Sequence, residues 1–82
     1  MKDETDYVKR SQYRTKVIKS LDGEVKIPSK IAKESGIYPN HISAILQQLR
    51  EHQLVECSNP EVRKGRLYRL TEKGEKIAEN IR

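Results

Sequence analysis

Two short amphipathic segments, separated by a glycine and a proline, restrict most strongly the fold that this chain can form. Ser29 can cap a first helix, and Gly36 stands where a left-handed residue ends such a helix. Pro39 suits the first turn of a second helix, because proline lacks the N–H group that would be unpaired there. In this second segment, which runs to about His52, the apolar residues recur at helical spacing: Ile42, Ile45, Leu46 and Leu49. Two helices with so short a connection predict a helix-turn-helix.

The elements before this pair are expected to be short as well. From Asp6 to Leu21, apolar residues recur about every four positions and predict one helix. Asp22-Gly23 is a turn signal that ends this helix. Val25–Ile27 is expected to form a brief strand, because Pro28 disfavours helical backbone in the residue that precedes it.

The last third of the chain predicts a hairpin and a final helix. Residues 54–58 and 65–70 both have the composition of strands, and Asn59-Pro60 marks a turn between them. Thr71 can then cap a last helix. The order helix, strand, helix, helix, strand, strand, helix predicts a small α+β domain.

Length and composition limit the classes of protein that remain. A chain of 82 residues can bury one modest core, so we expect a tail at residues 1–5 and a single domain at residues 6–82. No run approaches the about 20 apolar residues of a membrane helix, and the N-terminus lacks a signal-peptide core, which favours a cytoplasmic protein. Cys57 is the only cysteine and is expected to be buried and inert. We therefore expect no internal disulfide, metal or cofactor.

The predicted helix 39–52 has an unusual polar face. At 100° per residue, the side opposite the apolar residues carries amide, hydroxyl, imidazole and methyl groups. These groups belong to Asn40, His41, Ser43, Ala44 and Gln47. Amides can pair with adenine and a methyl group can touch thymine, so this face can read base edges. An ordinary solvated face is the alternative, although such a face more often carries Lys and Glu four residues apart.

Positive charge gathers beside these helices. The chain has 17 Lys and Arg against 12 Asp and Glu, a net charge of +5 that attracts polyanions. At the first of the paired helices, Ser29 and Lys30 lie where free N–H groups can hold a phosphate, and Lys33 follows on an exposed side. The cations of the hairpin tip can reach a flanking phosphate or a minor groove, and they are Arg63, Lys64 and Arg66. Cations that block pairing at a sheet edge are the alternative.

Two tyrosines are ambiguous by position. Tyr68 alternates with its neighbours so that it is expected to pack against the core. Tyr38 precedes the helix 39–52, where its ring can pack while its hydroxyl reaches a phosphate.

Three runs of the sequence resemble a known family. YRTKVIKSL, IPSKIAKESGIYPNHISAILQQLREHQLVEC and NPEVRKGRLYRLTEKGEKI are similar to archaeal winged-helix transcriptional regulators, relatives of the arsenical-repressor-like (ArsR) and MarR-like superfamilies. The resemblance implies double-stranded DNA binding, with 39–52 as recognition helix and 59–66 as wing. By position it puts the polar residues of the helix, Asn40, His41, Ser43, Ala44 and Gln47, at the major groove. It puts Arg63, Lys64 and Arg66 at the flanking backbone.

The sequence also departs from the relatives. His52-Gln53 stands where such sequences often have a glycine, which leaves the geometry of the following strand open. The metal-sensing relatives carry paired cysteines on the recognition helix, and this chain has none there, which argues against metal control. Many relatives have additional helices for dimerisation; here a homodimer is expected to use the first and last helices. No small-molecule effector is evident.

The sequence leaves three alternatives to DNA binding: an enzyme, a protein-interaction module and an RNA-binding protein. An enzyme is disfavoured, because the chain has no Gly-rich phosphate loop, and His41 and Ser43 are two residues apart and point in different directions on a helix. A protein-interaction module of a nucleic-acid complex is the stronger alternative, since fold alone does not determine function. RNA is less favoured, because no exposed aromatic pair is predicted for base stacking.

Overall fold

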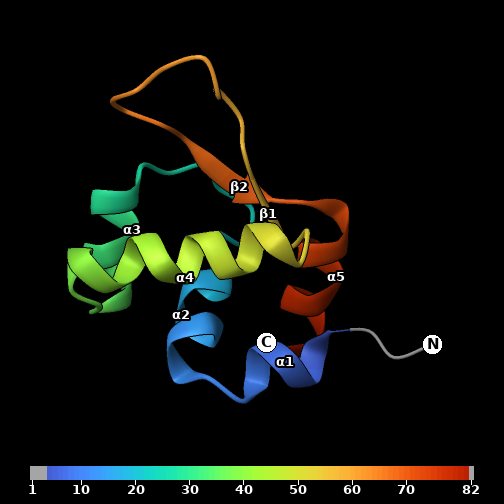
Figure 1. Cartoon of the computed structure of the whole chain (residues 1–82). Helices are drawn as coiled ribbons and strands as arrows, with labels where there is room; N and C mark the ends of the chain where they lie inside the picture. Colours follow the sequence, from blue (N-terminus) through green and yellow to red (C-terminus); the bar gives the residue numbers. More distant parts are fainter. Residues whose placement is uncertain (1–3, 82) are drawn as a thin grey trace.

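The computed structural model describes residues 4–81, which form helices and a two-stranded antiparallel sheet (Figure 1). The helices are α1 (Thr5–Lys9), α2 (Gln12–Ser20), α3 (Pro28–Ser35), α4 (Pro39–Glu51) and α5 (Glu72–Ile81). The strands are β1 (Val55–Cys57) and β2 (Tyr68–Leu70). None of the helices in this part of the chain is long and apolar enough to cross a bilayer.

The segment expected to be one helix, 6–21, is two helices. Ser11 has extended backbone, and its hydroxyl accepts a hydrogen bond from the Arg14 N–H at 3.2 Å, so it caps α2 and ends α1. The tail expected at residues 1–5 is also too long. Thr5 begins α1 and Glu4 pairs with Lys73, whereas residues 1–3 lie outside the described residues.

The strand expected at Val25–Ile27 is reduced to a single bridge. Lys26 and Tyr68 exchange backbone hydrogen bonds of 3.0 and 2.8 Å, while Val25 and Ile27 are exposed. Only one residue pairs, because Pro28 already begins α3. The hairpin strands, expected at residues 54–58 and 65–70, are also shorter and span 55–57 and 68–70. Residues 58–67 between them form a loop that hydrogen bonds of Asn59 hold in shape.

The helix-turn-helix itself is confirmed, with one correction at its start. Gly36 ends α3 with φ of 70°, and Pro39 is the first residue of α4. Ser29, however, does not cap α3. Pro28 occupies the first helical position, so Ile27 is the N-cap and Ser29 lies in the first turn.

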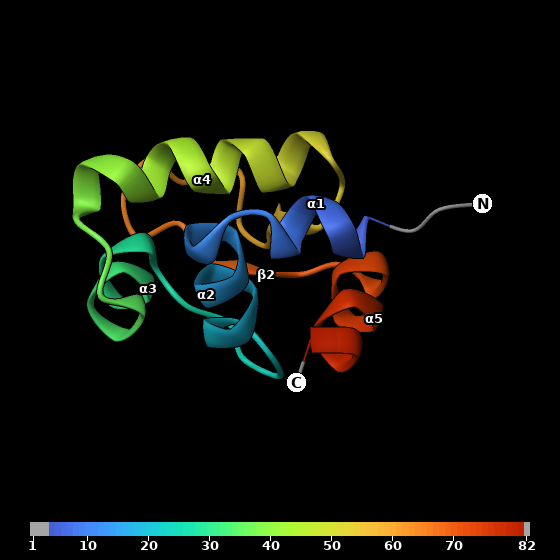
Figure 2. The ribbon, with the colours of Figure 1, turned by 90° about the horizontal axis from the view of Figure 1, so that it is seen from below.

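The core is a single cluster to which all five described helices and both strands contribute. Figure 2 shows α2 lying between α3 and α5 on one side of α4, and α2 contacts all three. The large side chains with less than 2% exposure are Val8, Val17, Ile18, Leu21, Ile31, Ile42, Leu49, Leu54 and Ile77. At α5 the backbone comes so close that a Cβ on Gly74 would lie 2.1 Å from the Leu54 carbonyl oxygen. This packing fixes the position of the hairpin relative to α4.

A buried cation that the sequence did not reveal joins α2 to α3. Lys26 is 4% exposed, and its ammonium group donates to the Ser20 carbonyl and to the Glu34 carboxylate. The hydrogen bond from Lys26 lowers the pKa of Glu34, and the positive charges of Lys26, Lys30 and Lys33 lower it further against a smaller effect of desolvation. Lys26 is thereby paired, as a buried charge must be.

Candidate nucleic-acid interface

The outer face of α4 is exposed as its periodicity predicts. All five polar or small residues singled out on this face are exposed, namely Asn40, His41, Ser43, Ala44 and Gln47. The opposite face, with Ile42, Ile45, Leu46 and Leu49, is buried. The side chains of Asn40, Ser43 and Gln47 make no hydrogen bond with any described residue. Their donors and acceptors are therefore free for an external partner.

His41 lies at the edge of this face. Its ring is tilted against the Tyr13 ring of α2, with centroids 5.8 Å apart. Tyr38, the N-cap residue of α4, is 74% exposed, and Tyr13 is 39% exposed. Tyr38 therefore does not pack into the core. From the sequence alone, RNA binding is disfavoured because no exposed pair of aromatic residues is predicted. Tyr13 and Tyr38 are both exposed, so this reason against RNA binding no longer holds.

The start of α3 offers fewer backbone donors than expected. Ser29, Lys30 and Lys33 are all exposed. Pro28 has no N–H group, and the Lys30 N–H already donates to the Ile27 carbonyl at 3.1 Å. Among the first three residues of α3, the Ser29 N–H is thus the one left for an anion, with the Lys30 and Lys33 side chains beside it.

The wing, residues 59–66, is held in shape by Asn59. The Asn59 Nδ2 donates to the Gly65 carbonyl at 3.2 Å, and its Oδ1 accepts from the Leu67 N–H at 2.7 Å. Arg66 is half-buried, and its Nε donates to the Val62 carbonyl at 2.8 Å. Arg66 is thus part of the loop's own bracing. The side chains of Arg63 and Lys64 at the tip are exposed and unpaired among the described residues.

Arg69 and Cys57 have structural partners. Arg69 lies opposite Glu56 in the register of β1 and β2, and its Nε donates to the Glu56 carboxylate at 2.8 Å. Arg69 is therefore bound within the sheet and is not one of the free cations. Cys57, expected to be buried, is half-buried, with its Sγ 3.5 Å from the Asn59 Oδ1. In residues 4–81, no group of three or more His, Cys, Asp or Glu side chains could hold a metal ion.

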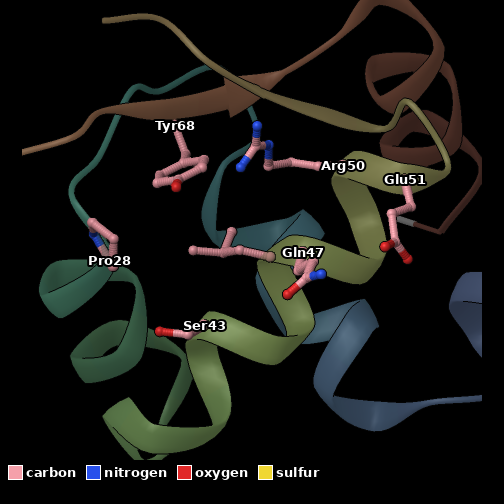
Figure 3. A pocket seen from close by; sticks show the side chains of 7 residues that line it. Pro28, Ser43, Gln47, Arg50, Glu51 and Tyr68 are labelled. Carbon is pink, nitrogen blue, oxygen red and sulfur yellow. The ribbon is translucent and has the colours of Figure 1, made fainter. Parts of the chain in front are cut away.

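A groove that the sequence did not predict runs between α4 and β2 (Figure 3). Ser43, Gln47, Arg50 and Glu51 of α4 line one side, Tyr68 of β2 and Pro28 line the other, and Leu46 of α4 also contributes to the lining. The spacing of Ser43, Gln47 and Arg50 could have placed Arg50 on this side of α4. Tyr68 could not have been found from its neighbours in sequence, because its position depends on how the hairpin packs against α4.

A second cluster lies at the far end of α4. Arg14 lies over the Tyr7 ring at 3.8 Å, and the Tyr7 ring stacks on His52 with centroids 3.9 Å apart. Glu4 accepts hydrogen bonds from His52 and Lys73. Desolvation raises the pKa of Glu4, but the hydrogen bonds and charges of Lys73 and His52 outweigh it and lower the pKa overall. This cluster anchors α1 to the end of α4 and is structural.

The fold and this surface together define a class. A helix-turn-helix, followed by a two-stranded hairpin with a braced loop and a final helix, is a winged-helix-like α+β fold.

Solved structures share this fold. The MarR family transcriptional regulator SPO1453 from Silicibacter pomeroyi DSS-3 is 20% identical with a TM-score of 0.78, covering 93% of this chain and 57% of its own. Lactococcus lactis ZitR, wild type in complex with DNA, is 24% identical with a TM-score of 0.77, and the match covers 87% of this chain and 49% of the ZitR chain. This chain thus spans about half the length of these structures. No known family profile and no curated protein sequence matches the chain.

Proposed function

We propose that this chain binds double-stranded DNA sequence-specifically and regulates transcription. In this proposal α4 lies in the major groove, where Asn40, Gln47 and Ser43 hydrogen-bond base edges and Ala44 contacts a thymine methyl. The observation that carries the proposal is that the exposed face of α4 presents amide, hydroxyl and methyl groups that make no side-chain hydrogen bonds within residues 4–81. A face that served only solubility would carry paired charges.

The cations support the same orientation. The exposed Arg63 and Lys64 of the wing contact the flanking backbone or minor groove, and Arg66 positions the wing beside that backbone. Ser29, Lys30 and Lys33 of α3 face a further phosphate near the start of α3. Tyr38 and His41, at the start of α4, lie beside one of the two DNA backbones that border the major groove.

The solved neighbours support the proposal by their described roles. SPO1453 is a transcriptional regulator, and ZitR has been seen with DNA bound. We further propose that two copies of the chain bind a partly symmetric site, with α1 and α5 forming the contact between them. Kinship with the archaeal regulators that the sequence resembles remains part of this proposal.

Selection of binding sites from random duplexes tests the function. We expect one enriched motif, and a repeat within it if two copies bind. A variant with Asn40→Ala and Gln47→Ala should lose the motif but keep salt-sensitive binding, whereas the control Lys19→Ala, at an exposed position of α2, should select the wild-type motif. Enrichment of nothing from duplex pools, together with binding to single-stranded RNA or to a protein, would reject the proposal.

A further inference from the structure

The groove between α4 and β2 contains two polar side chains that have no partner among residues 4–81. The Tyr68 ring is largely buried, with 8% of the residue exposed, and its hydroxyl, which lines the groove, makes no hydrogen bond with any described residue. The Arg50 guanidinium, on the other side of the groove, likewise has no hydrogen bond or ion pair within residues 4–81. Figure 3 shows the Tyr68 hydroxyl pointing from β2 toward α4, and the Arg50 side chain extending from α4 toward β2.

The Tyr68 side chain is held rigidly in this position. The backbone N–H of Tyr68 donates to Lys26 at 2.8 Å, its carbonyl accepts from the Lys26 N–H at 3.0 Å, and Tyr68 pairs with Cys57 across the sheet. Its ring is buried in the core cluster. A donor fixed in this way loses little conformational entropy when it binds a ligand.

We propose that this groove holds one phosphodiester of the DNA backbone, with the Arg50 guanidinium and the Tyr68 hydroxyl donating to its non-bridging oxygens. The inference rests on the proposed function, because α4 in the major groove and the wing on the flanking backbone bring a phosphate strand over the gap between α4 and β2. Arginine and tyrosine are both donors to phosphate, and their side chains approach the groove from its two sides.

Glu51 determines where in the groove the phosphate lies. Its carboxylate lines the end beyond Gln47, and Figure 3 shows it directed away from Tyr68 and Ser43. A phosphate next to Glu51 would be repelled, so the anion lies at the Tyr68 end. Arg50, which extends toward that end, is the cation that reaches it.

Two substitutions separate the two donors by their salt dependence. Arg50→Gln removes one cation and should reduce the slope of log K against log salt by about 0.9, the value for one phosphate contact. Tyr68→Phe keeps the ring and removes only a neutral hydroxyl, so it should weaken binding about tenfold at every salt concentration without changing the slope. Lys19→Gln, at an exposed position of α2 that has no role in the proposed interface, removes the same charge elsewhere and should change neither quantity.

Neutral methylphosphonates, placed one at a time in a selected duplex, identify the phosphate. A methylphosphonate at one position should lower the affinity of the wild-type protein but not that of the Arg50→Gln variant. The two changes would then remove the same contact, that between Arg50 and this phosphate. If the wild-type protein binds duplex but both variants bind like it, or if the loss from Arg50→Gln depends on the base sequence, the groove assignment is wrong and the proposed function stands. If the wild-type protein binds no duplex, the proposed function itself fails.

Discussion

The contacts of the wing predict how much its two exposed cations contribute to the salt dependence of DNA affinity. Arg63 and Lys64 are exposed and have no partner among the described residues, so each can neutralise one phosphate. Each phosphate contact contributes about 0.9 to the slope of log K against log salt. Replacing both with glutamine should therefore reduce the slope by about 1.8. When salt rises from 50 to 200 mM, the wild-type protein should therefore lose about twelvefold more affinity than the double variant.

The assay is fluorescence anisotropy of a labelled duplex at four salt concentrations. Arg69→Gln is the matched control, because Arg69 lies on the same hairpin but donates to Glu56. Its slope should stay close to that of the wild-type protein. Arg66 is left unchanged, because its Nε donates to the Val62 carbonyl and its loss would alter the loop as well as the charge.

Two results would refute this reasoning. An unchanged slope in the Arg63 and Lys64 double variant would remove the wing tip from the interface. An equally large change for Arg69→Gln would mean that net charge, and not contact at the tip, determines the salt dependence.

Three further predictions concern single positions. Gln47→Ala should cost about 1 to 3 kcal/mol at one base pair of the selected site, measured by competition with single-base variants; an equal loss on every sequence would contradict base reading. Gln53→Gly should raise the free energy of unfolding by about 0.5 to 1 kcal/mol in urea titrations, because Gln53 has φ of 61°, and no gain would contradict strain there. Glu34 has a lowered folded-state pKa, so its stabilisation is present above the ordinary value of 4.5 and is lost as pH falls below it. Thermal unfolding of Glu34→Gln should accordingly depend less on pH in this acidic range than that of the wild-type protein, and equal dependence would contradict the pairing with Lys26.

Local signals predicted the helix-turn-helix well, because caps and breakers act over a few residues. Gly36 and Pro39 mark the same boundaries in the sequence and in the structure. The division of residues 6–21 was missed, since apolar spacing continues across Ser11 and hides the cap that its hydroxyl provides. Ser29 was misplaced by two positions in its helix, because Pro28 takes the first helical position and Ile27 is the N-cap.

Contacts between distant segments could not be predicted. The groove joins Arg50 to Tyr68, and Tyr68 reaches it only because its backbone pairs with Lys26. The buried ammonium group of Lys26 is equally non-local, since its partners lie on two different helices. Gln53 has left-handed backbone, with φ of 61°, and the sequence left the geometry at this position open.

The two faces of α4 are made by separate sets of residues. Ile42, Ile45 and Leu49 bind the helix to the core, while the side chains of Asn40 and Gln47 make no hydrogen bond within residues 4–81. Substitutions at these outward positions therefore carry little penalty for folding, and their consequences fall on the external partner alone. Under the proposed function, a few exposed side chains of α4 can therefore be replaced to change the preferred DNA site without rebuilding the core, which suits the domain to laboratory redesign.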